Sequence, residues 1–119
     1  MAEALSIRRG TTRDAHKRLA GDFRFYLAES ASQLAGVVAI RSNTHLYCLF
    51  VDKPFKRTGL ARRLWAQVKE ESLKLGNDGD FTVNASNYAV AAYEKLGFRR
   101  TESTKESNGV LYNPMRFVR

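Results

Sequence analysis

The segment from His45 to Val51, with the sequence HLYCLFV, is almost continuously apolar over seven residues. A strand with one face in solvent alternates apolar and polar side chains, so this run predicts a strand covered on both faces in the middle of a sheet. Pro54 follows shortly and ends the strand, because proline has no N–H for the ladder. A chain with such a strand has to be built around a central sheet with helices packed on both of its faces.

The segments around this strand predict a mixed α/β sheet. Leu60, Leu64, Val68 and Leu75 recur near the helical period, and Gly76 is a natural end for the helix that they form. This helix would connect the central strand to a parallel strand at 81–84. Further strands are expected at 5–9, 23–28, 33–41, 98–101 and 112–118, with helices at 14–20 and 87–96. Residues 1–119 are therefore expected to form one α/β (α+β) domain.

Basic residues gather where the long helix begins. Lys56 and Arg57 stand just before its start, and Arg62 and Arg63 fall in its first turn. A helix N-terminus already carries partial positive charge and unpaired N–H groups, so cations there predict a bound anion. Gly59 fits this interpretation, because a residue without a side chain lets a phosphate approach the backbone. The alternative is a set of solvated surface cations beside a flexible turn; the known P-loop and dinucleotide patterns are both absent.

Composition narrows the class of protein. Lys plus Arg number 20 against 12 Asp plus Glu, and the net charge of +8 indicates an anionic partner: a nucleic acid, an acidic membrane face or a phosphorylated ligand. The single cysteine, Cys48, excludes a disulfide framework, and no metal site is expected. No apolar run approaches the roughly 20 residues that span a bilayer. The N-terminus is too polar for a signal peptide, so a cytoplasmic protein away from membranes is expected.

Two motifs carry a resemblance to a known family. Residues 51–61, VDKPFKRTGLA, resemble the acetyl-CoA motif of the GNAT N-acetyltransferases, [Gln/Arg]-x-x-Gly-x-[Gly/Ala], with Lys56, Gly59 and Ala61 at its fixed positions. Lys56 keeps the charge of the usual arginine but not its fork geometry. Residues 83–98, VNASNYAVAAYEKLGF, are similar to the later motif of the same family, which ends in Tyr-Glu-Lys-Leu-Gly-Phe. The resemblance runs from Phe23 to the C-terminus, whose tail is similar to that of a GNAT subgroup of undefined substrate.

The resemblance implies a twisted, mostly antiparallel sheet that splays open between two central parallel strands, which end near Val51 and Asn84. Acetyl-CoA would lie in the splay as co-substrate. The residues expected to bind it are Leu49, Phe50 and Val51 along the pantetheine arm, Lys56, Arg57, Thr58, Gly59, Leu60, Ala61 and Arg62 around the pyrophosphate, and Asn84 with Ser86 or Asn87 near the pantetheine or adenosine side. Ser86 stands seven residues before the tyrosine, where many relatives carry asparagine, so the choice between Ser86 and Asn87 stays open.

The reaction implied by the resemblance is acetyl transfer to a primary amine by direct attack in a ternary complex. Tyr93 matches the acid of the family and would protonate the departing CoA thiolate. His45 is the first candidate for a general base and Glu29 the second, while a water chain could replace both. Cys48 is expected to be a small core residue.

The N-terminal region is shorter than that of relatives, which place two helices between the first two strands to wall the acceptor site. Here thirteen residues separate Arg9 from Phe23, room for about two helical turns. The acceptor pocket is then open, completed by a second subunit, built for a large partner, or lost. A homodimer is expected, because Phe23 and Phe25 need burial. The competing functions are a non-catalytic CoA-binding module and a nucleic-acid-associated protein, although no RNA motif or recognition helix supports the latter.

Overall fold

The structure is a computed structural model that describes residues 5–10, 23–31 and 33–118. In chain order the elements are β1 (Ser6–Arg9), β2 (Phe23–Ser30), β3 (Gln33–Arg41), β4 (His45–Val51), the 3-10 turn η2 (Lys53–Phe55), α1 (Leu60–Lys74), β5 (Thr82–Ala85), α2 (Val90–Lys95), β6 (Phe98–Arg100), β7 (Lys105–Ser107) and β8 (Val110–Phe117). The helix expected at 14–20 lies outside the described residues.

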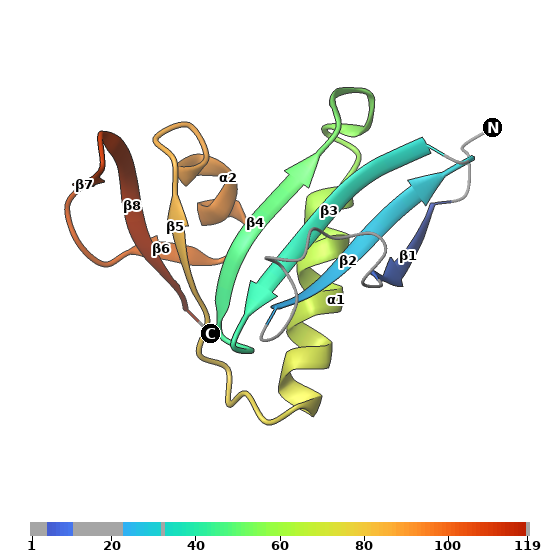
Figure 1. The fold of residues 1–119 in the computed structure, drawn as a ribbon, viewed down its shortest axis with the longest axis horizontal. Coiled ribbons are helices and arrows are strands. Elements are labelled where there is room, and N and C mark those ends of the chain that lie inside the picture. The colour runs from blue at the N-terminus through green and yellow to red at the C-terminus, as the bar shows by residue number, and fades with distance from the viewer. Residues whose placement is uncertain (1–4, 11–22, 32, 119) are drawn as a thin grey trace.

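One twisted sheet runs through the molecule in the order β1-β2-β3-β4-β5-β8-β6, and β7 pairs with β8 (Figure 1). Neighbouring strands are antiparallel except β4 and β5, which are parallel and are connected through α1. The mostly antiparallel sheet with two central parallel strands is therefore confirmed.

Helix α1 covers one face of β2, β3 and β4 (Figure 1). Its buried side chains are Leu60, Leu64, Trp65, Val68 and Ser72, which is the spacing of a helix with one apolar face. The Trp65 ring lies 5.0 Å from the ring of Phe81 and 5.1 Å from that of Phe98, centroid to centroid. Each fully buried side chain of this size contributes about 1.5–3 kcal/mol, so this face supplies the main core.

The parallel ladder between β4 and β5 is short. Only His45 with Thr82 and Leu46 with Val83 are paired, although β4 continues to Val51. At the next position the β3–β4 register shifts, since Ile40 opposes Leu46 and Ala39 opposes Cys48. Tyr47 is thus the extra residue of a bulge, and a bulge increases local twist. Beyond it the two strands diverge, and Figure 1 shows them as the two arms of an open V with α2 beside β5.

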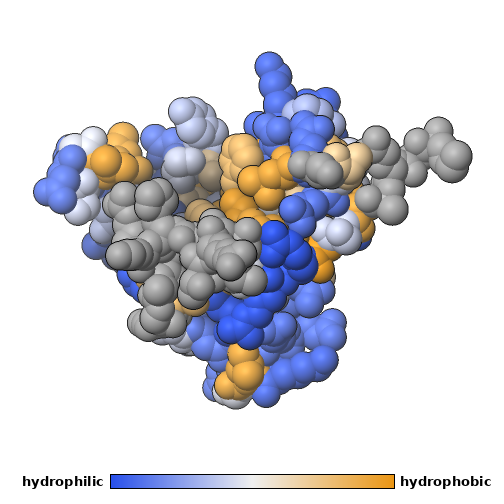
Figure 2. All heavy atoms as spheres, turned by 45° about the vertical axis from the view of Figure 1, so that its right-hand side comes forward, coloured by the Kyte–Doolittle hydropathy of each residue, from blue (hydrophilic) through white to orange (hydrophobic). Residues whose placement is uncertain are grey.

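The expectation that β4 is covered on both faces is wrong. Tyr47 is 52% exposed and Phe50 is 51% exposed. Among the described residues, helix α1 packs on only one face of β2, β3 and β4. Apolar side chains are also visible at the surface in the upper middle of Figure 2. The apolar side chains of β4 are therefore divided between the buried core and the exposed surface.

The C-terminal region contains one strand that was not expected, β7, in the connection between the strands expected at 98–101 and 112–118, and β7 forms a hairpin with β8. Asn108 and Gly109 have φ angles of 52° and 80°, the left-handed conformation that a two-residue hairpin turn requires. Residues 105–107 are exposed along their whole length, so no apolar alternation marks them as a strand in the sequence. The helix expected at 87–96 is also shorter, Val90–Lys95, and a turn precedes it.

The aromatic residues of β2 are covered within the single chain. Phe25 is 9% exposed, and the Phe23 ring packs edge-on against Tyr47 with the centroids 5.0 Å apart. Burial of these side chains therefore does not require a second subunit. The homodimer stays a prediction, and light scattering that finds only a 13.5 kDa particle would contradict it.

Candidate active site

A cleft of about 550 Å³ lies in the splay between β4 and α2. Its floor is apolar, and four cationic side chains line it, with no carboxylate among the lining residues. The lining residues are Leu49, Phe50 and Val51 from β4, Phe55, Lys56, Arg57, Gly59, Leu60, Ala61 and Arg62 from the following loop and α1, and Ala89, Ala92, Tyr93, Lys95 and Leu96 from α2 and the turn before it. The expected pantetheine and pyrophosphate residues, except Thr58, are thus brought together.

The β4 wall of the cleft offers a strand edge. From Cys48 to Val51, β4 pairs with β3 on one side and has no partner in β5 on the other. An extended ligand can pair with such an edge through main-chain hydrogen bonds. This edge exists only because the parallel ladder stops at Leu46.

The N-terminus of α1 forms the second wall. Its N-cap is Gly59, at φ 83° and ψ 7°, with no side chain capping the first turn and no acidic residue in it. A side chain at Gly59 would meet no other atom within 4 Å, so the space over the helix end is open. Thr58 instead turns back and donates a hydrogen bond to the Phe55 carbonyl, which explains why it does not line the cleft. The free N–H groups of the first turn are available to an anion.

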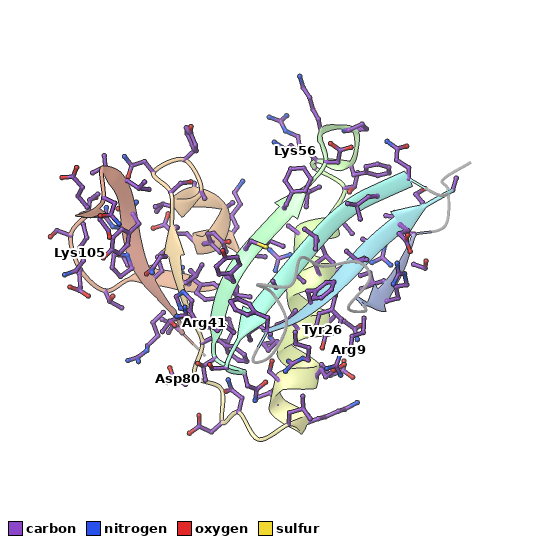
Figure 3. The ribbon with its side chains drawn as sticks, in the orientation of Figure 1. Arg9, Tyr26, Arg41, Lys56, Asp80 and Lys105 are labelled. Carbon is purple, nitrogen blue, oxygen red and sulfur yellow. The ribbon has the colours of Figure 1, made fainter. Side chains whose placement is uncertain are left out.

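Lys56 lies in the loop directly after β4, above the splay (Figure 3). It lines the cleft with Arg57, Arg62 and Lys95. Within the described part of the chain, every ion pair lies elsewhere. Arg63 faces away and approaches the Leu5 carbonyl at 3.5 Å. The cleft is therefore a positively charged site with an apolar floor, which favours an anionic ligand.

Tyr93 projects from α2 into this site. Its side chain is 7% exposed, and its ring packs edge-on against Phe98 with the centroids 5.7 Å apart. Burial, and the nearby Cys48 thiol, raise the pKa of Tyr93 to about 12. Among the described residues the hydroxyl has no hydrogen-bond partner, although the side chain lines the cleft. A phenol held protonated and unpartnered in a cleft is suited to donate to a ligand atom.

Cys48 sits on the opposite face of β4 from α1, as a small side chain against Phe25, Leu27 and Ala39. Burial raises the pKa of its thiol. The thiolate is the nucleophilic form, so this environment disfavours a covalent role. The expectation of a core residue agrees with this packing.

His45 lies at the other end of β4, in a second pocket of about 350 Å³. Its Nδ1 is 2.8 Å from the Thr82 hydroxyl oxygen, and burial and then the charge of Arg41 lower its pKa, so the ring is neutral at pH 7. Four residues of strand separate it from Leu49 in the cleft, roughly 13 Å at about 3.3 Å per residue. Glu29, the second candidate for a base, pairs with Arg8 at 2.8 Å on β2 and lines neither pocket. The structure thus brings neither candidate to Tyr93, and both roles stay predictions.

The polar residues expected on the β5 wall do not line the cleft. Asn84 faces the second pocket with His45. The Asn87 side-chain oxygen accepts a hydrogen bond of 2.9 Å from Asn113, which is 1% exposed and also donates to the Ala85 carbonyl at 3.1 Å. Asn87 therefore holds the turn before α2 against β8. Ser86 is exposed outside the cleft, so the choice between Ser86 and Asn87 stays open.

The described part of the chain contains no helix long and apolar enough to cross a membrane. It also contains no group of three or more His, Cys, Asp or Glu side chains that could hold a metal ion.

The sequence profile of a family described as "Acetyltransferase (GNAT) domain" matches residues 7–119. The chain belongs to the GNAT acetyltransferase family. Solved structures with the same fold include a GCN5-related N-acetyltransferase from Rhodopseudomonas palustris (TM-score 0.80, 15% identity, 98% of each chain covered). Another is the ribosomal-protein-S18-alanine N-acetyltransferase from Escherichia coli (TM-score 0.76, 19% identity, 96% of this chain and 93% of that chain covered). No curated protein matches the sequence.

In this GNAT acetyltransferase, the α2 wall of the cleft includes residues that the two sequence motifs did not single out. Ala89, Ala92 and Leu96 line the cleft beside Tyr93, as does Lys95. Counting three and four residues from Tyr93 along a helix finds Ala89 and Leu96, because such positions share a face, whereas Ala92 directly precedes Tyr93. Lys95 has no such signal, since it stands next to Leu96 in sequence and only its side-chain direction brings it to the site.

Proposed function

We propose that this GNAT protein transfers the acetyl group of acetyl-CoA to a primary amine, by direct attack of the amine in a ternary complex. The observation that carries the proposal is Tyr93, a mostly buried side chain whose hydroxyl has no partner among the described residues, in a cleft between a free strand edge and a cation-lined helix N-terminus. No other titratable side chain of the cleft is both buried and uncharged at pH 7.

The donor would be held by two main-chain features. The pantetheine arm would pair with the free edge of β4 along Leu49, Phe50 and Val51. The pyrophosphate would accept hydrogen bonds from the first turn of α1, with Lys56 and Arg57 adding charge. Bound in this way, the donor would have its thioester end at the apolar floor beside Tyr93.

The chemistry would then need few groups. The neutral amine nitrogen attacks the thioester carbonyl carbon, the new C–N bond forms, and the C–S bond breaks as CoA leaves. Tyr93 would donate its hydroxyl hydrogen to the sulfur as negative charge develops there. The proton lost by the amine passes to solvent, and the Tyr93 phenolate regains a proton from solvent before the next turnover.

The direct test is a thiol-release assay with acetyl-CoA and a panel of amines, polyamines and peptide N-termini. The proposal predicts release of CoA thiol that depends on one class of amine, and acetylated amine in equal amount by mass spectrometry. Binding of acetyl-CoA without turnover of any amine would indicate a non-catalytic CoA-binding module. If the protein binds RNA or DNA with steep salt dependence and does not bind acetyl-CoA, the proposal is wrong.

A further inference from the structure

Arg62 and Lys95 line the cleft from two separate helices, and the Arg62 side chain contacts the Lys95 main chain. The Arg62 Nη2 atom on α1 donates a hydrogen bond of 3.0 Å to the main-chain oxygen of Lys95, the last residue of α2. Both residues line the cleft. The contact holds the Arg62 guanidinium at Lys95, which is the residue at the carboxyl end of α2.

Neither charge has a counterion among the described residues. Other exposed cations of the molecule do pair with carboxylates: Arg8 with Glu29 at 2.8 Å, Lys105 with Glu102 at 3.0 Å and Arg116 with Asp80 at 3.1 Å. Glu94 precedes Lys95 but does not line the cleft. Two cations that line one cleft without a counterion favour an anionic ligand there.

The pyrophosphate of the donor does not account for this anion, because the N-terminus of α1 with Lys56 and Arg57 already serves it. CoA carries one further anionic group, a phosphomonoester on the 3′ oxygen of its ribose, with a charge of about −1.5 to −2 at pH 7. A guanidinium and an ammonium on one side of the cleft match such a dianion.

We infer that Lys95 and Arg62 bind the 3′-phosphate of CoA, so that the cleft selects CoA over its 3′-dephospho form. The inference rests on the proposed function, since it takes the cleft to be the acetyl-CoA site. Lys95 is then a specificity-determining residue, and α2 contributes to donor recognition as well as to the chemistry at Tyr93.

The test is calorimetric titration of the full chain with CoA and with 3′-dephospho-CoA, which differ only in this phosphate. We expect the Kd for dephospho-CoA to be about tenfold higher or more. Lys95→Gln should raise the Kd for CoA by a similar factor and leave the Kd for dephospho-CoA within about twofold. The matched control is Lys105→Gln, which removes the same charge from hairpin β7–β8, far from Lys56 and the cleft in Figure 3, and should change neither Kd.

The outcomes separate the two proposals. Equal affinity of the unmodified chain for CoA and dephospho-CoA overturns the 3′-phosphate site and leaves the acetyl-CoA cleft standing. A Lys95→Gln variant that weakens both ligands equally also overturns it, because the effect is then general electrostatic attraction. If neither ligand binds, the proposed function fails, and the inference fails with it.

Discussion

Leu46 on β4 and Val83 on β5 form the last pair of the parallel ladder, directly before the bulge at Tyr47. Below this pair the two strands belong to one continuous sheet, and above it they separate and the cleft begins. The position of the cleft along the chain is thus set by where two strands stop pairing.

The charge over Gly59 can be tested with a matched pair of variants. Asp and Asn have nearly the same shape, and both tolerate the left-handed backbone that Gly59 adopts at φ 83°. We expect Gly59→Asp to raise the Kd for acetyl-CoA by about tenfold or more, because its carboxylate repels the pyrophosphate. Gly59→Asn should stay within a few-fold of the unmodified chain by calorimetry. Equal binding by both variants would place the pyrophosphate elsewhere.

Tyr93→Phe should separate catalysis from packing. The change keeps the ring against Phe98 and removes a hydroxyl that has no partner among the described residues, so the melting temperature should not fall. We expect kcat with the true acceptor to drop by about 10²- to 10⁴-fold, while the Kd for acetyl-CoA stays within a few-fold. An unchanged kcat, with chemistry shown to limit the rate, would make Tyr93 a packing residue.

Stability at high pH should depend on the same residue. The pKa of Tyr93 is about 12 in the folded chain and 10.0 is its ordinary value, so between these values the folded chain holds more protons than the unfolded chain. The free energy of unfolding should therefore fall as pH rises through this window, by about 2–3 kcal/mol from Tyr93. Urea unfolding at pH 9 and pH 11.5 should show a shallower loss for Tyr93→Phe; an equal loss would contradict the raised pKa.

Arg24 should be needed for stability and not for binding. It is 8% exposed and donates to the Tyr26 hydroxyl at 2.8 Å, the Asn43 side chain at 3.0 Å and the Ser72 hydroxyl at 2.7 Å. Arg24→Met removes the donor of all three hydrogen bonds. We expect the free energy of unfolding, measured with urea, to fall by about 2–4 kcal/mol. Arg100→Met, at an exposed position, should change stability by less than about 0.5 kcal/mol. Weaker acetyl-CoA binding by folded Arg24→Met would contradict the separation of this cluster from the cleft.

Gly36 should be required for the shape of the β4 edge. A Cβ added there would lie 2.8 Å from the Phe50 carbonyl oxygen and 3.1 Å from a methyl carbon of Leu64. Gly36→Ala must therefore push β4 and α1 away from β3. We expect this change to lower the free energy of unfolding by about 1–3 kcal/mol. Because Phe50 lines the cleft, acetyl-CoA binding should weaken as well. Unchanged stability and affinity would show that β3 can shift without moving this edge.

The sequence by itself determined the features that depend on neighbours in the chain. The apolar run after His45, the helical spacing of Leu60, Leu64 and Val68, and the strand at Val83 predict the parallel crossover, because periodicity reports which face of an element is buried. The same local patterns predict Gly59 at the start of α1 and a helix that contains Tyr93, while the resemblance to the GNAT family implies that Tyr93 lies beside the donor site.

Only the tertiary structure decided the features that join distant parts of the chain. Phe50 is half exposed on β4 beyond the bulge at Tyr47. Asn113 donates a hydrogen bond to the Asn87 side chain, and His45 contacts the Thr82 hydroxyl outside the cleft. The Arg62 side chain donates a hydrogen bond to the main-chain oxygen of Lys95. Each contact links residues 26–37 positions apart or depends on where a strand pair ends. Such contacts depend on strand register, twist and side-chain direction in the folded molecule. Hydrophobic periodicity along the sequence does not predict them.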